Sequence, residues 1–450
     1  MITYVILLIL IAAILVTAYR KFDRDILSPT VVSCAAFFVS ILLALIGLLS
    51  WNDQAELLPT TAVICVVGLL SFFIGEFLAR RIIRKKNNGE KDKEETLKII
   101  QLHSIVYLSL ALFIIVTTII LVLEIKKVCA AFGFEGGSMP ELLAFYRSKT
   151  SLFSNELLSN GIDISFIPKQ MKKIVDCLFI VLGFIGVNNY LSNKNNKKAY
   201  LIPLILAILC VPSSFLANGG RSMFMHMIIS ILIIVLLMIR WTRRQKNSVA
   251  NNKKIIIAVS VAAIVSGLSF YALSPIVGRK TNSDLVTYIS FYYGTPVASM
   301  NKKIASGDIG DNEIGGKTFY GVYSTLNRYG IIDYKKPSSD DWVTHNSYHS
   351  NVYTSFWSYY SDFGIIGVIV CQTVFGFCVS YIYVSMNNSR RPKYLIFVYA
   401  YYSYVLIDQV RGEHFYSLLS STTLVYLVIF YLIYTLLIKE NKKCPLLKKK

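Results

Sequence analysis

The sequence predicts an all-α polytopic membrane protein with about eleven transmembrane helices, an external N-terminus and a cytoplasmic C-terminus. The first observation is composition: 54% of the 450 residues are hydrophobic and the mean hydropathy is +0.54, which excludes an ordinary soluble globular protein. The second is length, because a helix needs about 20 mostly apolar residues to cross a bilayer. Eleven windows meet that requirement: 2–19, 26–50, 58–79, 99–123, 174–191, 199–216, 222–239, 255–274, 363–386, 394–410 and 418–438.

The third observation is where the positive charge lies. The formal net charge is +20, and if the spans alternate, 29 of the 46 Lys and Arg residues fall on one side of the membrane. The positive-inside rule makes that side cytoplasmic. We therefore attribute the charge to orientation and to contact with anionic membrane lipids, and expect no nucleic-acid partner. The segments on that side are 20–25, 80–98, 192–198, 240–254, 387–393 and 439–450.

Within this plan we expect residues 1–450 to form a single integral-membrane domain. The window 2–19 is too long for a removable signal peptide and lacks its charged start and small-residue cleavage site, so we interpret it as a retained span. Residues 124–170 form an external amphipathic loop, in which Ser138 and Glu141 make a capping-box pattern that opens a short surface helix.

The largest external loop is 275–362, between the eighth and ninth spans. It cannot cross a bilayer, and it holds 11 Tyr, two Trp, eight Lys or Arg and two His. Aromatic faces and fixed cations beside a membrane suit a sugar linked to a phospholipid. We interpret this loop as a lid over an active site.

Ionisable residues inside the spans are few. They are Glu76, His103, Asp176, His226 and Asp408. His103, Asp176 and Asp408 lie near the ends of predicted spans, where we expect interfacial water to solvate them. Glu76 lies four residues before Arg80, so either an ion pair at the cytoplasmic end or a proton relay accounts for it. No chain of acids and histidines lies at the midplane, which argues against a proton-coupled transporter.

A candidate anion site lies where one predicted span ends and the next begins. Gly219 and Gly220 permit close backbone approach to a ligand, and Arg221 adds a guanidinium at the N-terminus of the following helix. Together they suit a phosphate. The alternative is that the glycines only make the turn and that Arg221 reaches lipid headgroups.

Further external arginines would also bind diphosphate, because guanidinium forks match its oxygens and keep their charge. The alternative is that each pairs with a nearby acid at the surface. These arginines are Arg147, Arg279, Arg328 and Arg411.

Three histidines are candidate general bases for a hydroxyl. His345 and His349 have the spacing of one helical face, and His414 lies beside Glu413. The alternative for all three is a polar loop residue. No HExxH motif is present and the eight cysteines lack ligand spacing, so we expect no metal and no cofactor, and cysteines that fill space in the spans.

Aromatic residues crowd the end of the large loop. Tyr353, Trp357 and Tyr360 precede Asp362 and suit stacking on sugar rings. An interfacial aromatic belt accounts for them equally well.

These features resemble the Wzy-type polymerases of O-antigen and capsular polysaccharide, the oligosaccharide repeat-unit polymerases. The resemblance rests on the eleven-span layout with one late external loop, on the element Gly219-Gly-Arg-Ser222, and on residues 351–367, which end Asp362-Phe-Gly-Ile-Ile-Gly367. The first feature covers nearly the whole chain, and the last is the most specific.

The resemblance implies a metal-independent membrane glycosyltransferase of the bacterial cytoplasmic membrane. Its donor and acceptor would be polyprenyl-diphosphate-linked oligosaccharides on the outer face, and a flippase and a chain-length regulator would be further partners. Arg221, with Arg279 or Arg411, would hold the diphosphate, and His345, His349 or His414 would lie near the acceptor hydroxyl.

Two rival functions stay open. An O-antigen ligase of similar architecture would transfer finished polymer to another acceptor. A flippase or transporter of lipid-linked oligosaccharide would favour short external loops and polar residues within the spans, opposite to this sequence.

Overall fold

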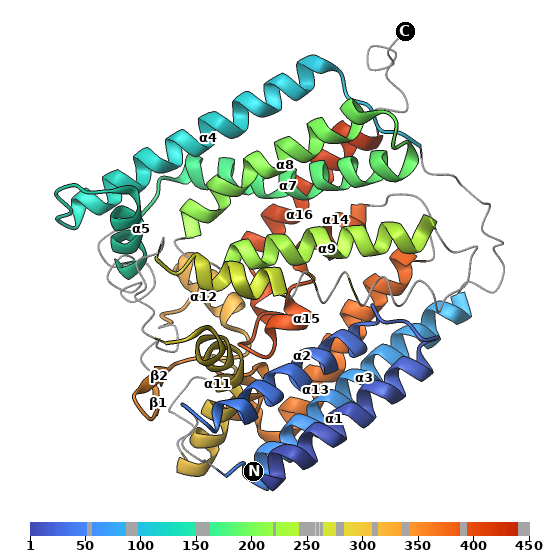
Figure 1. Cartoon of the computed structure of the whole chain (residues 1–450), viewed down its shortest axis with the longest axis vertical. Coiled ribbons are helices and arrows are strands. Elements are labelled where there is room, and N and C mark those ends of the chain that lie inside the picture. The colour runs from blue at the N-terminus through green and yellow to red at the C-terminus, as the bar shows by residue number, and fades with distance from the viewer. Residues whose placement is uncertain are drawn as a thin grey trace. The chain divides into compact units, whose positions relative to one another are not determined.

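The computed structural model describes residues 1–51, 56–86, 98–149, 163–218, 222–242, 257, 261, 264–275, 283–307, 314–334, 342–387 and 394–439. The chain divides into two compact units, and both are built from long helices (Figure 1). Unit 1 comprises Met1–Asp92, Ser283–Ser389 and Tyr404–Leu424. Unit 2 comprises Lys93–Asn282, Arg390–Ser403 and Val425–Lys450.

The predicted fold class is confirmed: the chain is an all-α polytopic membrane protein. Among the described residues, nine helices are long and apolar enough to cross a membrane. Window 255–274 is described only at 257, 261 and 264–274, and window 394–410 forms two short helices, α14 (Tyr394–Tyr402) and α15 (Val405–Asp408). The count of eleven, the orientation and the single domain stay predictions.

Unit 1 is held together by helices from both ends of the sequence. Its long helices are α1 (Ile2–Lys21), α2 (Pro29–Gly47), α3 (Pro59–Lys86), α11 (Leu285–Ser306) and α13 (Ser355–Asn387). Helices α3 and α13 pack along each other at backbone contact (Figure 1). A Cβ on Gly75 would lie 2.2 Å from the Thr373 carbonyl oxygen, so only glycine permits this approach.

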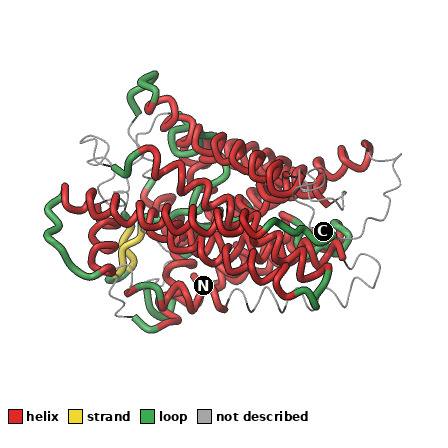
Figure 2. Tube along the Cα trace, turned by 90° about the horizontal axis from the view of Figure 1, so that it is seen from above, coloured by secondary structure: helices red, strands yellow, loops and turns green. Residues whose placement is uncertain are grey.

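The region 275–362, predicted as a loop, contains regular structure. Helix α11 packs against α2, where the Ser40 hydroxyl donates to the Tyr293 carbonyl oxygen at 2.6 Å. A short helix and a hairpin follow, and α13 begins inside the region. The hairpin is drawn in yellow in Figure 2, and its register pairs Val343 with Ser350. The new elements are α12 (Tyr320–Arg328), β1 (Val343–His345) and β2 (Tyr348–Ser350).

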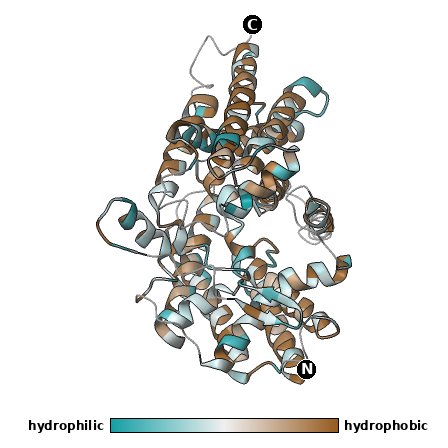
Figure 3. Cartoon of the chain, turned by 90° about the vertical axis from the view of Figure 1, so that its left-hand side faces the viewer, coloured by the Kyte–Doolittle hydropathy of each residue, from teal (hydrophilic) through white to brown (hydrophobic). Residues whose placement is uncertain are grey.

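Unit 2 packs around its most buried helix, α7. Figure 3 shows hydrophobic residues along the long helices. Helix α7 contacts α4, α8, α9 and α14. The elements of this unit are α4 (Ser104–Ala131), α5 (Met139–Arg147), α7 (Phe166–Ser192), α8 (Lys197–Asn218) and α9 (Ser222–Thr242). Along the C-terminal part of the chain lie η3 (Tyr416–Leu418) in unit 1, α16 (Ser421–Tyr434), which continues from unit 1 into unit 2, and η4 (Thr435–Lys439) in unit 2.

The predicted capping box is confirmed. The Glu141 carboxylate accepts the Ser138 backbone N–H at 2.8 Å at the start of α5. Leu142, Leu143 and Tyr146 bury the apolar face of α5 against the end of α4. The helix is therefore amphipathic, as its sequence indicates.

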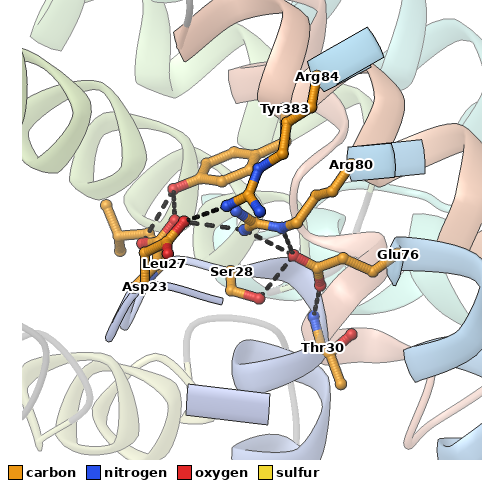
Figure 4. Close-up of polar contacts among 9 residues, drawn as sticks. Asp23, Leu27, Ser28, Thr30, Glu76, Arg80, Arg84 and Tyr383 are labelled. Atoms are coloured by element: carbon orange, nitrogen blue, oxygen red, sulfur yellow. Dashed lines mark hydrogen bonds and ion pairs between the residues drawn. The ribbon is translucent and has the colours of Figure 1, made fainter. Parts of the chain in front are cut away.

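A buried ionic network closes one end of unit 1 (Figure 4). Arg80 donates from Nε to Glu76 Oε1 at 2.8 Å, and its Nη2 lies 3.5 Å from Asp25 Oδ2. The Tyr383 hydroxyl donates to Asp25 at 2.9 Å. The predicted Glu76–Arg80 pair is thus confirmed, and it is one part of a network that joins the α1–α2 connection, α3 and α13.

The same network ties down the start of α2. The Ser28 hydroxyl donates to Glu76 Oε1 at 2.7 Å, and the Thr30 backbone N–H donates to Oε2 at 2.8 Å. Glu76 therefore satisfies a free amide in the first turn of α2. Since Asp25 and Arg80 meet, the described ends of two basic segments predicted to share one side, 20–25 and 80–98, lie together at one end of unit 1.

We expect Arg80→Ala to lower the free energy of unfolding by about 3–5 kcal/mol, because it leaves two buried carboxylates without their cation. Arg84→Ala is the matched control: its 2.8 Å pair with Asp23 is about two-thirds exposed, so the expected loss is below about 1 kcal/mol. Denaturant unfolding of the purified variants in detergent measures both. Equal losses would contradict the account.

Candidate functional site

Arg411 is a largely buried cation in unit 1. Its side chain is 15% exposed, and its Nη1 lies 3.7 Å from Asp408 Oδ1. The guanidinium carbon lies 5.3 Å from the centre of the Tyr293 ring. Nε is buried and makes no hydrogen bond within the described part of the chain. The short turn after α15 fixes this position, since the Arg411 N–H donates to the Asp408 carbonyl oxygen at 2.7 Å.

This environment leaves hydrogen-bonding capacity for an anion. A guanidinium carries five N–H donors in a planar fork, and a 3.7 Å ion pair is too long to count as a hydrogen bond. Asp408 is 6% exposed, so our expectation that solvent explains this carboxylate is wrong; it partly offsets the charge of Arg411 instead. A phosphate oxygen would satisfy Arg411 better than its present neighbours do.

Glu413 lies two residues further on, and its carboxylate is held by the Tyr359 hydroxyl and by the backbone N–H groups of Phe415, Tyr416 and Ser417. Oε1 accepts the Tyr416 N–H at 2.6 Å and the Tyr359 hydroxyl at 3.4 Å, and Oε2 accepts the Ser417 N–H at 2.9 Å. Burial raises the pKa of the Glu413 carboxyl to about 7, against the hydrogen bonds that favour the charged form. A carboxyl with this pKa exchanges its proton near neutral pH.

His414 completes what we call the Arg411 cluster: Arg411, Glu413 and His414 with Tyr293, Tyr359, Tyr404 and Asp408. The His414 ring lies 6.1 Å from the Tyr404 ring, and its backbone carbonyl oxygen accepts the Ser417 hydroxyl. Two predicted site residues, Arg411 and His414, are therefore close together on one half-buried segment.

The predicted shared helical face of His345 and His349 is wrong, because the two residues lie on the β1–β2 hairpin. His345 pairs with Tyr348 while His349 pairs with Thr344, so the two imidazoles point to opposite faces of the hairpin. Asn346, with φ of 52°, makes the turn that the helical spacing conceals.

The two imidazoles also differ in exposure. His345 is fully buried, and its Nε2 lies 2.9 Å from the Ser299 hydroxyl of α11. His349 is exposed, with Nδ1 3.1 Å from the Thr344 hydroxyl. A buried His345 holds the hairpin against α11, which is a structural role.

The other predicted arginines that the structure describes lie on other elements. Arg328 is exposed at the end of α12 in unit 1, and Arg147 ends α5 in unit 2. Four predicted site residues lie outside the described residues: Gly219, Gly220, Arg221 and Arg279.

The aromatic residues near Asp362 are mostly packed. Trp357 is 2% exposed, with Lys317 Nζ 5.1 Å from its ring centre and the Tyr353 ring at 5.9 Å. We expected the Trp357 ring to stack on a sugar, but the Lys317 ammonium group contacts it instead. Tyr353 and Tyr360 are half-buried against the core of unit 1.

The motif Asp-Phe-Gly-x-x-Gly shapes the start of α13. Asp362 Oδ2 accepts the Thr318 N–H at 2.7 Å. Gly364 interrupts the helix with φ of 64° and ψ of −158°, and a Cβ on Gly367 would lie 2.6 Å from the Tyr359 carbonyl oxygen. These residues fix the first turns of α13, which carry Tyr359 to Glu413.

A second buried carboxylate lies in unit 2, and here too our expectation of solvation is wrong. Asp176 is 1% exposed. Its Oδ2 lies 2.8 Å from Lys172 Nζ and 2.7 Å from the Tyr426 hydroxyl, and the Ser214 hydroxyl donates to Oδ1. This network satisfies its own charges and joins α7, α8 and α16. His103, by contrast, is exposed and caps α4, as expected for an interfacial residue.

Within the described residues no group of three or more His, Cys, Asp or Glu is arranged to hold a metal ion. The seven cysteines found there are all free thiols, and six of them are buried. The Arg411 cluster itself offers a guanidinium that can bind an anion, and a carboxyl and an imidazole that can transfer a proton.

In the sequence, Glu413 stands out only as a neighbour of Arg411 and His414. The Tyr359 hydroxyl, which donates to Glu413, lies 54 residues away in the sequence, so no local pattern connects the two. The available signal was an acidic residue within a short Arg-Gly-Glu-His stretch beside a span.

We expect Gly364→Ala to lower the free energy of unfolding by about 1–3 kcal/mol, because its φ and ψ lie in a region used almost only by glycine. No atom lies within 4 Å of the added methyl group, so the cost comes from the backbone alone. Gly307→Asn is the control, since its left-handed conformation tolerates asparagine. Denaturant unfolding in detergent measures both variants. A Gly364→Ala protein with an unchanged free energy of unfolding would show that the backbone at this position does not require glycine.

The raised pKa of Glu413 makes stability depend on pH. Because the folded protein holds this proton more tightly than the unfolded chain, the contribution is complete below the ordinary pKa of 4.5 and is lost as pH rises through about 7. We therefore expect the melting temperature to fall between pH 5 and 8, and Glu413→Gln to reduce that fall. If the melting temperatures of the wild type and of Glu413→Gln change identically with pH, burial does not raise the pKa of Glu413.

Comparison with protein-family models, with curated proteins and with solved structures finds no match for this chain.

Proposed function

We propose that this protein is a polysaccharide polymerase of the membrane glycosyltransferase class. It joins oligosaccharide repeat units carried on polyprenyl diphosphate, at the outer face of a bacterial cytoplasmic membrane. The resemblance to Wzy-type polymerases supplies the substrate class, and the helical membrane architecture agrees with it. A flippase that delivers the donor and a chain-length regulator are the expected partners.

The observation that carries the proposal is the environment of Arg411. A guanidinium that is 15% exposed, lies over Tyr293 and keeps an unused buried Nε is suited to a diphosphate. Anion binding there would replace weak partners with charge-assisted hydrogen bonds. A lipid-linked diphosphate would reach such a group from the membrane surface.

The proposed reaction needs little general-acid catalysis from the protein. The acceptor hydroxyl attacks the anomeric carbon of the donor, and the bond from that carbon to the diphosphate oxygen breaks. Diphosphate leaves with the electron pair, so stabilising its developing negative charge is the main task. Arg411 performs that task, and direct displacement inverts the anomeric configuration.

The test is chain growth by purified protein in liposomes that contain lipid-linked repeat units. The wild type is expected to give a ladder spaced by one repeat unit. Arg411→Ala is expected to lower the rate about 10²–10³-fold, by analogy with loss of one transition-state donor. Arg84→Ala, an exposed arginine of α3, is the matched control and keeps the full rate.

The rival functions give different products in the same experiment. A ligase transfers preformed polymer to another acceptor and builds no ladder. A transporter moves the lipid-linked sugar across the bilayer without lengthening it. Either result, or full activity of Arg411→Ala at equal protein level, would refute the proposal for this site.

A further inference from the structure

We propose that Asp408 lowers the affinity of Arg411 for anions, so that polyprenyl diphosphate leaves the site after each transfer. The inference rests on the function proposed above and concerns how that site releases its product. Arg411 Nη1 and Asp408 Oδ1 lie 3.7 Å apart. A diphosphate on Arg411 is therefore attracted by the guanidinium and repelled by the neighbouring carboxylate, and the balance of the two charges sets its affinity.

The Asp408–Arg411 pair is built on one backbone turn. The Asp408 N–H donates to the Tyr404 carbonyl oxygen at 2.8 Å, and the Arg411 N–H donates to the Asp408 carbonyl oxygen at 2.7 Å. The side chains approach only to 3.7 Å, a distance at which unlike charges attract but do not form a hydrogen bond. Asp408 thus reduces the positive charge at the site while leaving the guanidinium N–H groups to an anion.

Tyr293 keeps the guanidinium in place by a contact of a different kind. Its ring centre lies 5.3 Å from the guanidinium carbon, and its carbonyl oxygen accepts the Ser40 hydroxyl at 2.6 Å, which fastens this turn of α11 to α2. A cation over an aromatic face is attracted by the ring quadrupole. Removing the Asp408 charge therefore leaves Arg411 with a partner that orients it.

Burial strengthens the effect of the Asp408 charge. The Arg411 side chain is 15% exposed and the Asp408 side chain 9% exposed, so water screens their interactions poorly. Asp23 and Arg84 form the opposite case, a 2.8 Å ion pair that is about two-thirds exposed. Neutralising Asp408 should therefore change anion affinity far more than neutralising Asp23.

The proposed reaction makes a product with more negative charge than its donor. The donor diphosphate is esterified at both ends, by the sugar and by the polyprenol. After transfer the sugar is gone, and the product has a free terminal phosphate, which carries additional charge near neutral pH. A guanidinium alone would bind this product more tightly than the donor. A fixed carboxylate opposes that preference, because it repels the more highly charged species more strongly.

The competing role for Asp408 is structural, as the counter-ion of a largely buried arginine. Asp408→Asn separates the two roles, because it removes the charge and keeps the shape. A purely structural role predicts lower stability and an unchanged affinity of the folded protein for anions. Asp23→Asn, which removes the partner of an exposed arginine, is the matched control.

Calorimetric titration of the purified protein in detergent with inorganic pyrophosphate, at neutral pH, tests the proposal. Asp408→Asn is expected to bind pyrophosphate at least about tenfold more tightly than the wild type, because juxtaposed like charges are strongly unfavourable. Arg411→Gln should lose this binding, and Asp23→Asn should match the wild type. In liposomes, added polyprenyl diphosphate should inhibit chain growth by Asp408→Asn at a correspondingly lower concentration.

The role of Asp408 and the proposed function fail separately. A wild-type protein that builds no ladder refutes the function. Pyrophosphate affinities that are equal in the wild type and Asp408→Asn, or binding that is absent from both, overturn the role of Asp408. If Asp408→Asn does not fold, Asp408→Glu decides, since it keeps the charge and moves the carboxylate: a changed affinity supports the role, and a wild-type affinity overturns it.

Discussion

Unit 1 depends on one arginine placed between two buried carboxylates. Asp25 and Glu76 are each held by three donor groups, and Arg80 is the cation that they share. In a low-dielectric interior, two carboxylates without a cation would cost several kcal/mol each. Because both carboxylates need Arg80, the α1–α2 connection, α3 and α13 pack together at one end of unit 1. Tyr359 lies before the Gly364 interruption of α13, so its contact with Glu413 depends on the first turns of that helix.

The Arg411 cluster differs from that network in how well it is satisfied. Arg80 has two carboxylates, whereas Arg411 has a distant Asp408, a tyrosine ring and an unused Nε. Asp176 in unit 2 is likewise fully partnered. Polar groups that satisfy one another stabilise a fold, and a group left short of partners in a membrane protein is a candidate for a ligand. That contrast is why we place substrate binding at Arg411.

Several local features were predicted correctly from local patterns in the sequence. Apolar runs gave the fold class, spacing gave the Glu76–Arg80 pair, and Ser138 with Glu141 gave the cap of α5. Long-range partners were beyond that reasoning, since Tyr383 lies 358 residues from Asp25. Helix α11 was missed because its buried face carries polar residues such as Ser290, Ser299 and Asn301. His345 and His349 were misassigned because a two-residue turn breaks the helical spacing.

We propose that the hairpin and the Arg411 cluster lie at the outer end of unit 1, where lipid-linked sugars are available. Cysteine labelling with a membrane-impermeant maleimide in intact cells tests it most directly. Ser347→Cys, exposed at the hairpin tip, is predicted to react without permeabilisation, and Asn195→Cys, exposed between α7 and α8, only after it. Labelling of Asn195→Cys alone in intact cells would reverse the orientation and contradict the account.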